Sequence, residues 1–267
     1  MKRLILAAVV LAVSSTAAWS SPLGPTSTLY LTAGNNQTVF MVNGTTITSF
    51  SEPTNQFAIA VSGGTVRILD DVNPTYGSEY SLTGVPDGVT FPYFIPNYTD
   101  DGTTDGTHNF VSQWSSGNIY ETNLDFSNPT LFFNAGSNTL GVTYDGLNNS
   151  LWVSSYGGSD NTVRDYSMTT HQLLSSFTTG STSNVALSYD TADNTLWMLE
   201  GNTLVQYAVT GGPVLQSMNI GAQTSGALVF GGEFGETPGS PAVPEPASLF
   251  LLATGVLGLR KACRRVS

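Results

Sequence analysis

The sequence is poor in the residues on which most enzymes and metal sites depend. Its 267 residues include one cysteine and two histidines, which excludes an internal disulfide and a cysteine-rich metal site. His108 and His171 do not stand at the spacing of a metal-binding pair. No Gly-x-Ser-x-Gly motif is present to hold a nucleophilic serine on a strand-to-helix turn. The sequence therefore predicts no catalytic residues and favours a protein that is not an enzyme.

Charged residues are also scarce, at 10% of the chain, where about a quarter is usual. Six of the eight basic residues lie in the first three or last eight positions. Between Ser21 and Ala242 only Arg67 and Arg164 remain, against 18 of the 19 acidic residues. Such an acidic surface repels phosphate backbones, so nucleic acid is excluded as a partner. Frequent aromatic residues in short apolar runs, separated by turn-forming residues, predict a folded all-β protein.

The N-terminus has the three parts of a secretory signal peptide. Lys2 and Arg3 precede the apolar stretch Leu4–Val13. Small residues follow, and Ala18-Trp19-Ser20 forms a small-x-small site before Ser21. Ten apolar residues are too few to cross about 30 Å of hydrocarbon. We expect residues 1–20 to be a signal peptide cleaved between Ser20 and Ser21, with cleavage after Ala18 as the alternative. Residues 21–234 are then the exported domain.

The C-terminus also has three parts. Residues 235–246 form a linker with four prolines, a composition that does not fit a helix or a sheet. An apolar run at 247–259 follows, about 20 Å long if helical, which is short for a membrane span. By the positive-inside rule, a basic tail stays cytoplasmic while the body lies outside. We expect residues 247–267 to form an apolar helix with a basic stop-transfer tail and to be anchored transiently in the inner membrane. The basic residues of this tail are Arg260, Lys261, Arg264 and Arg265.

The same segment carries a family resemblance. Val243-Pro244-Glu245-Pro246, followed by the apolar run and the basic cluster, resembles the PEP-CTERM sorting domain. In that family the Pro-Glu-Pro motif is recognised during export by exosortase, a membrane protease-transferase. The resemblance implies a Gram-negative host, the export translocon and exosortase as partners, and an outer-surface or extracellular-matrix destination associated with exopolysaccharide and biofilm. A proline-rich linker before an ordinary tail anchor is the alternative, and neither interpretation gives the body an activity.

The interior contains one unit twice. The segment Thr139–Asp145 leads through Asn149 to Leu151-Trp152. Its Tyr, Asp, Asn, Leu and Trp all recur 45 residues later, ending at Leu196-Trp197. Each unit has four short β-like runs separated by turn residues, which in the first copy are 141–144, 151–155, 162–166 and 173–177. Four strands in about 40–45 residues is the period of a propeller blade.

The repeated pattern over Thr139–Gly221 resembles the blades of NHL-like and streptogramin-lyase-like propellers. Earlier segments are interpreted as diverged blades, with three strands each within 28–50 and 57–82. Three more lie within 109–133, and 89–94 is taken as the first strand of that blade. A strand at 226–230 is expected to pair with the N-terminal set and close the ring. We predict a β-propeller of about five four-stranded blades, with six as the other count and a β-sandwich as the alternative fold.

One patch is chemically suggestive. Asp100, Asp101 and Asp105 stand among glycines, and carboxylates so arranged can supply several of the six to eight oxygens that Ca²⁺ takes. No glutamate closes the loop at the twelfth position, and a solvated hairpin between two strands explains the same residues. Calcium bound by these three aspartates is the one cofactor considered.

Aromatic side chains are the other candidates for binding. Trp152 and Trp197 occupy equivalent apolar positions and are expected in the core. Trp114 and the proline-broken stretch Phe91–Tyr98 are better placed to be exposed and to stack on sugars. The favoured function is a non-enzymatic binding or structural module at the cell surface or in the matrix. The alternative is a secreted metal-dependent propeller enzyme of lyase or lactonase type, and the fold alone does not decide between them.

Overall fold

The computed structural model describes residues 24–71, 76–92, 95, 98–211 and 214–235. The predicted signal peptide at 1–20 and the sorting segment at 247–267 lie outside the described residues, as does the linker after Gly235. Within the described ranges, no helix combines the length and the apolar composition needed to cross a membrane. The expected apolar helix falls on residues that are not described.

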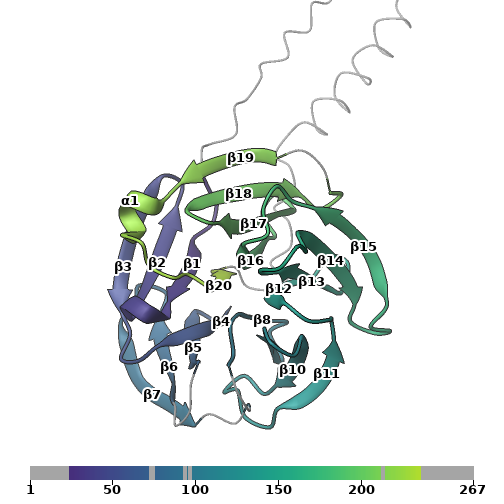
Figure 1. Ribbon diagram of the computed structural model, residues 1–267. Coiled ribbons are helices and arrows are strands. Elements are labelled where there is room, and N and C mark those ends of the chain that lie inside the picture. Colours follow the sequence, from purple (N-terminus) through teal and green to yellow (C-terminus); the bar gives the residue numbers. More distant parts are fainter. Residues whose placement is uncertain (1–23, 72–75, 93–94, 96–97, 212–213, 236–267) are drawn as a thin grey trace, which may run out of the picture.

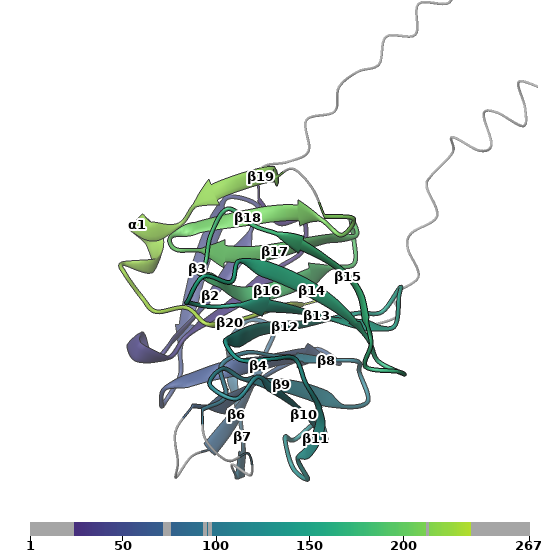
Figure 2. The same cartoon turned by 45° about the vertical axis from the view of Figure 1, so that its right-hand side comes forward.

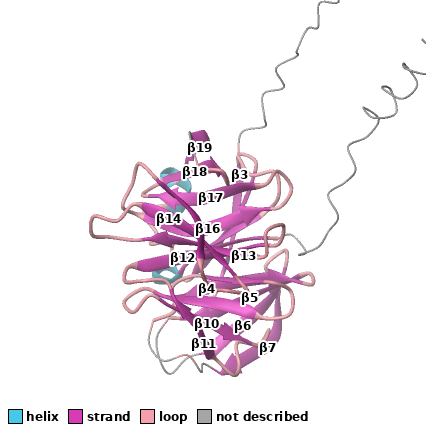
Figure 3. Cartoon of the chain, turned by 90° about the vertical axis from the view of Figure 1, so that its right-hand side faces the viewer, coloured by secondary structure: helices cyan, strands magenta, loops and turns pink. Residues whose placement is uncertain are grey.

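Five antiparallel sheets of four strands each stand around a common axis as the blades of a propeller (Figure 1). The predicted all-β fold and the count of five are confirmed. Figure 3 shows how little of the chain is helical: the described helices are the 3-10 turn η1 (Gly34–Asn36) and the single-turn α1 (Gly221–Thr224).

Each blade begins with the strand nearest the axis and continues outwards in chain order, except that the chain's last strand supplies the inner strand of blade 1. The strands are, for blade 1, β20 (Gly231–Phe234), β1 (Leu29–Ala33), β2 (Thr38–Asn43) and β3 (Thr46–Ser51); for blade 2, β4 (Gln56–Ser62), β5 (Thr65–Asp70), β6 (Tyr76–Ser81) and β7 (Pro86–Pro92); for blade 3, β8 (Gly102–Thr104), β9 (Asn109–Gln113), β10 (Asn118–Thr122) and β11 (Thr130–Asn134); for blade 4, β12 (Thr139–Asp145), β13 (Ser150–Ser155), β14 (Thr162–Ser167) and β15 (Leu173–Thr178); and for blade 5, β16 (Asn184–Asp190), β17 (Thr195–Glu200), β18 (Thr203–Ala208) and β19 (Val214–Asn219).

The ring is closed by the pairing of β20 with β1, from Leu29 opposite Phe234 to Thr32 opposite Gly231. Figure 2 shows β20 inside the ring, where it lies against the inner strand β16 of blade 5 as well as β1. Closure by a C-terminal strand was therefore predicted correctly, but its position was not, because 226–230 is a loop. A Cβ atom at Gly231 would lie 1.9 Å from the Phe57 carbonyl oxygen, so this close approach of two inner strands requires glycine.

The expected first strand of blade 3 was also wrong. The segment from Pro86 to Pro92 is β7, the outer strand of blade 2, and the inner strand of blade 3 is β8. The reason is that β8 consists of Gly102, Thr103 and Thr104, all buried although none is a large apolar residue. A prediction from hydrophobic patterning finds apolar strands, and it therefore assigned the apolar segment 89–94 instead of β8.

Hydroxyl groups on the second strands tie one blade to the next. Thr32 Oγ1 of β1 donates to the Phe57 carbonyl oxygen at 2.5 Å, and Ser154 Oγ of β13 donates to the Asn184 carbonyl oxygen at 2.7 Å. Ser112 of β9 makes the same kind of bond to Leu140. The core lies between the blades, where Trp152 and Trp197 are each 1% exposed, as expected.

Candidate functional site

The loops of the propeller lie on two faces. The leading face, as we name it, carries the loops that precede each inner strand and those that join the second strand of a blade to the third. The trailing face carries the remaining hairpins. Propeller sites form where loops from several blades meet near the axis, and the leading face brings together the candidate binding residues.

A row of four aromatic rings runs from blade to blade on the leading face. Trp114 follows β9 of blade 3, Tyr156 follows β13 of blade 4, Phe230 precedes β20 of blade 1 and Phe57 lies in β4 of blade 2. Successive ring centroids are 5.8, 5.6 and 4.9 Å apart. Tyr156 and Phe230 belong to blades 4 and 1, and both adjoin the start of blade 5. Tyr156 forms a β-bridge with Ser183, and the Phe230 carbonyl oxygen accepts the Ala186 N–H at 2.7 Å.

Trp114 is the accessible end of this row. Its side chain is 40% exposed, whereas Phe57 at the other end is 5% exposed. The indole Nε1 donates to the Tyr156 carbonyl oxygen at 3.1 Å, and the edge-on contact with the Tyr156 ring holds the indole plane in place. A fixed, half-open aromatic face is suited to stacking against a flat apolar surface of a ligand. The expectation that Trp114 is exposed is confirmed.

Asp100 is hydrogen-bonded to the backbone of Trp114. Its Oδ2 accepts a hydrogen bond from the Trp114 backbone N–H at 2.9 Å, and its side chain is 6% exposed. Burial raises the pKa of Asp100 to about 7, against the opposing effect of that hydrogen bond, and the charge of Asp71 adds to the rise. The group is therefore divided between its protonated and ionised forms near neutral pH.

Asp100 is one of several acidic side chains with raised pKa values in and beside blade 2. Burial, followed by the charge of Asp70, raises the pKa of Asp71 to about 6. Burial raises the pKa of Glu52 to about 9, with a further contribution from Asp70, although the Gln56 backbone N–H opposes the shift. Burial is the largest cause of each shift, so these groups keep their protons up to a higher pH than exposed carboxyl groups do.

Asp101, unlike Asp100, lies in the axis of the propeller. Its side chain is fully buried. Oδ1 accepts the N–H groups of Gly102 at 2.8 Å and Gly232 at 2.9 Å, and Oδ2 accepts that of Val142 at 3.1 Å. The Leu187 N–H also bonds this carboxyl group, and burial nevertheless raises its pKa. One carboxyl group thus joins the inner strands of blades 1, 3, 4 and 5.

The backbones of β12 and β16 are irregular where they contact Asp101. A bulge shifts the register of β12 between Thr139 and Val142, and an equivalent bulge in β16 lies between Val185 and Ser188. Bulges leave a backbone group outside the ladder. Here they free the N–H groups of Val142 and Leu187 for Asp101. The axis is consequently occupied by a hydrogen-bonded carboxyl group.

The three predicted calcium ligands do not converge. Asp100 lies on the leading face and Asp101 in the axis. Asp105 lies in the trailing-face hairpin, where its Oδ1 accepts the N–H groups of Thr107 and His108, each at 2.7 Å. Among the described residues, no three histidine, cysteine or acidic side chains are grouped so that they could hold a metal ion. Calcium binding by this trio receives no support from the geometry and stays a prediction.

The two histidines both lie in hairpins of the trailing face. The His171 ring packs against Phe132, with centroids 4.4 Å apart. His108 Nε2 lies 3.7 Å from a Glu121 carboxylate oxygen. Their surroundings are those of loop residues, and neither adjoins the aromatic row.

Basic side chains in the described part of the chain are limited to Arg67 and Arg164. Arg67 Nε lies 2.6 Å from Glu79 and the Arg164 guanidinium lies 2.7 Å from Asp160. Both cations are thus already neutralised by an acidic neighbour. A ligand with a negative charge finds no available cation among them.

Comparison with known proteins concerns the tail and the body separately. Residues 242–265 match the model of the PEP-CTERM protein-sorting motif. The predicted resemblance to that motif is therefore confirmed, although these residues lie outside the described part of the structure. A chain with this motif is exported to the cell surface. No curated protein matches the sequence.

The body is similar to several solved propellers. A chain of a nidogen/laminin complex has a TM-score of 0.59 at 11% identity, over 79% of this chain and 99% of its own length. Glutaminyl cyclase from Myxococcus xanthus has a TM-score of 0.51 at 12% identity, over 74% and 76%. Streptogramin B lyase has a TM-score of 0.46 at 15% identity, over 72% and 65%. At these identities the similarities concern the fold alone.

Proposed function

We propose that the chain is processed by exosortase and that its propeller then serves as a non-enzymatic binding and spacing module associated with exopolysaccharide at the cell surface or in the matrix. The observation that carries this proposal is the fixed, half-exposed indole of Trp114 on the leading face of a protein with a sorting motif at its C-terminus. The motif supports the destination, and the aromatic row supports binding at that destination.

The closed axis favours a surface site over a channel. Four backbone N–H groups and the Asp101 carboxyl group occupy the centre of the ring. A lyase or lactonase with its metal in the central channel would need open space and converging ligands there. We therefore place the interaction with polysaccharide on the outer surface, at Trp114.

Processing and destination are tested together by intact mass spectrometry of the protein from its native host, separated into inner-membrane, outer-surface and medium fractions. We expect a species that begins near Ser21 and ends between Pro244 and Ala247, in the outer-surface fraction. Because exosortase reads the Pro-Glu-Pro motif, the Glu245→Ala variant should accumulate uncut in the inner membrane. An outer-surface species that still carries Arg264 and Arg265 would contradict exosortase processing.

A further inference from the structure

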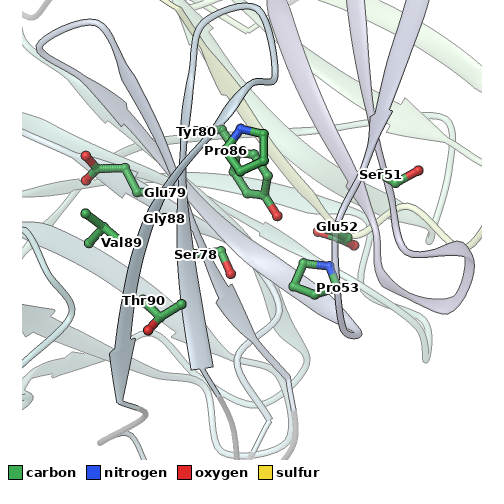
Figure 4. Close-up of a pocket in the computed structure, with 10 residues that line it drawn as sticks. All are labelled: Ser51, Glu52, Pro53, Ser78, Glu79, Tyr80, Pro86, Gly88, Val89 and Thr90. Atoms are coloured by element: carbon green, nitrogen blue, oxygen red, sulfur yellow. The ribbon is translucent and has the colours of Figure 1, made fainter.

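A pocket of about 420 Å³ lies between blades 1 and 2. This volume is within the range of small-molecule sites. One wall comes from the end of β3 and the loop after it, and the other from β6 and β7 (Figure 4). The residues that line it are Ser51, Glu52, Pro53, Ser78, Glu79, Tyr80, Pro86, Gly88, Val89 and Thr90.

Glu52 is the unusual member of this lining. Its side chain is 4% exposed, and neither carboxyl oxygen has a hydrogen-bond partner of normal geometry. In Figure 4 the carboxyl group and the Tyr80 hydroxyl point toward one another across the pocket, whereas Glu79 points away. A buried carboxyl group that lacks a hydrogen bond of normal geometry is costly. A ligand that offers it a hydrogen bond therefore gains affinity from that bond.

The charges around the pocket determine which charge a ligand can carry. Arg67 is the nearest basic side chain and is held by Glu79 at 2.6 Å and by Ser62 Oγ at 3.1 Å. An anionic ligand therefore has no free cation to pair with. Glu52 retains its proton at neutral pH, so a cation would have to displace that proton first. An uncharged ligand meets neither obstacle.

The remaining lining suits a ligand with both hydroxyl groups and apolar faces. Ser78 and Tyr80 carry hydroxyl groups on the same face of β6, and Ser78 Oγ also accepts a hydrogen bond from Gln56 Nε2 at 3.2 Å. Pro53, Pro86 and Val89 supply apolar surface. The Tyr80 ring is held by Phe50 of blade 1 at 4.9 Å between centroids. This contact helps to hold the Tyr80 side of the pocket in place without a ligand.

We propose that this pocket binds one uncharged sugar residue of a neutral glycan, with the Glu52 carboxyl group donating a hydrogen bond to it and Pro53 and Pro86 packing on its apolar faces. The inference rests on the proposed binding function and names the class of glycan. The pocket is separate from the Trp114 surface, so the experiment below distinguishes failure of the pocket from failure of the proposed function.

Titration calorimetry tests this with the exported protein purified from its host. The probes are glucose, galactose, mannose and N-acetylglucosamine, with glucuronate and Ca²⁺ as charged counterparts. We expect at least one neutral sugar to bind, and binding to weaken at least about tenfold in Glu52→Leu, as for loss of one buried hydrogen bond. Glu52→Gln should retain binding, because its amide still donates. Glu121→Leu, a change in blade 3, should bind as the wild type does.

The pH dependence gives a second readout. Wild-type binding should weaken as pH rises through about 9, where Glu52 loses its proton, and Glu52→Gln should not follow it. Failure of all four neutral sugars to bind, equal binding by Glu52→Leu, or preference for glucuronate or Ca²⁺ would overturn the proposal. Loss of matrix association in the Trp114→Ala variant with sugar binding intact would leave this pocket standing. Sugar binding by a protein that never reaches the matrix would contradict only the proposed function.

Discussion

Replacing Asp101 by leucine is expected to lower the free energy of unfolding by about 4 kcal/mol or more, enough to leave much of the protein unfolded. The change removes the only carboxyl group that accepts the N–H groups of Gly102, Val142, Leu187 and Gly232 in the axis. Each buried donor left without a partner costs about 1–3 kcal/mol. Urea unfolding of the full-length protein, followed by circular dichroism, measures the loss.

Two further variants separate this effect from the loss of a charge. Asp101→Asn keeps one accepting oxygen of similar shape, so its loss should be smaller than that of Asp101→Leu. Asp125→Ala removes an aspartate that only holds an exposed turn, where its Oδ1 accepts the Ser127 N–H at 3.1 Å. That variant should lose less than about 1 kcal/mol. An Asp101→Leu variant as stable as the Asp125→Ala control would refute the axial role of Asp101.

The second large effect is a loss of stability as pH rises. The pKa values of Glu52, Asp71 and Asp100 are raised on folding to about 9, 6 and 7. Between about pH 5 and pH 8 the folded chain therefore binds more protons than the unfolded chain, and the free energy of unfolding falls with rising pH. We expect a decrease of about 3 kcal/mol or more over that interval.

Glu52→Gln isolates the largest part of this effect. An amide of the same shape needs no proton, so the variant should be more stable than the wild type at about pH 8 and should show a shallower pH dependence. Urea midpoints of both proteins at several pH values provide the comparison, with Glu121→Gln as the control. A wild-type stability that rises from pH 5 to pH 8 would contradict the account of these buried carboxyl groups.

The sequence predicted blades 4 and 5 closely because their signals are local and repeated. The first unit was expected at 141–144, 151–155, 162–166 and 173–177, and each strand of blade 4 includes the corresponding range. Turn chemistry agrees as well: Asp145 Oδ1 accepts the Leu147 N–H at 2.9 Å, and Asp190 Oδ1 accepts that of Ala192 at 3.0 Å. Tyr-Asp followed by Asn and Leu-Trp is enough to specify such a hairpin.

The inner strand of blade 3 could not be found in this way. The strand β8 has three residues and directly follows Asp101, whose partners are 1, 41, 86 and 131 positions away in the sequence. Nothing within the Asp100–His108 patch distinguishes an axial carboxyl group from a calcium ligand. Only the closed ring brings the four N–H groups together.

Glu52 was missed for the same physical reason. A single acidic residue before Pro53, in a loop between strands, is most often solvated. Its burial depends on the packing of blade 2 against blade 1, including the contact of Tyr80 with Phe50. Trp114 was easier to identify, because it follows an apolar strand directly and lacks the repeated neighbours that place Trp152 and Trp197 in the core.

The central claim, that Trp114 on the leading face holds the exported propeller to polysaccharide, is tested most directly by affinity electrophoresis of the exported protein in gels containing the host's own exopolysaccharide. We expect the wild type to be retarded and the apparent affinity of Trp114→Ala to be at least about tenfold lower, equivalent to about 1.4 kcal/mol. Leu131→Ala, which removes a side chain 58% exposed on β11 of the same blade, should migrate like the wild type. Equal retardation of Trp114→Ala and the wild type, or no retardation of the wild type, would contradict the claim.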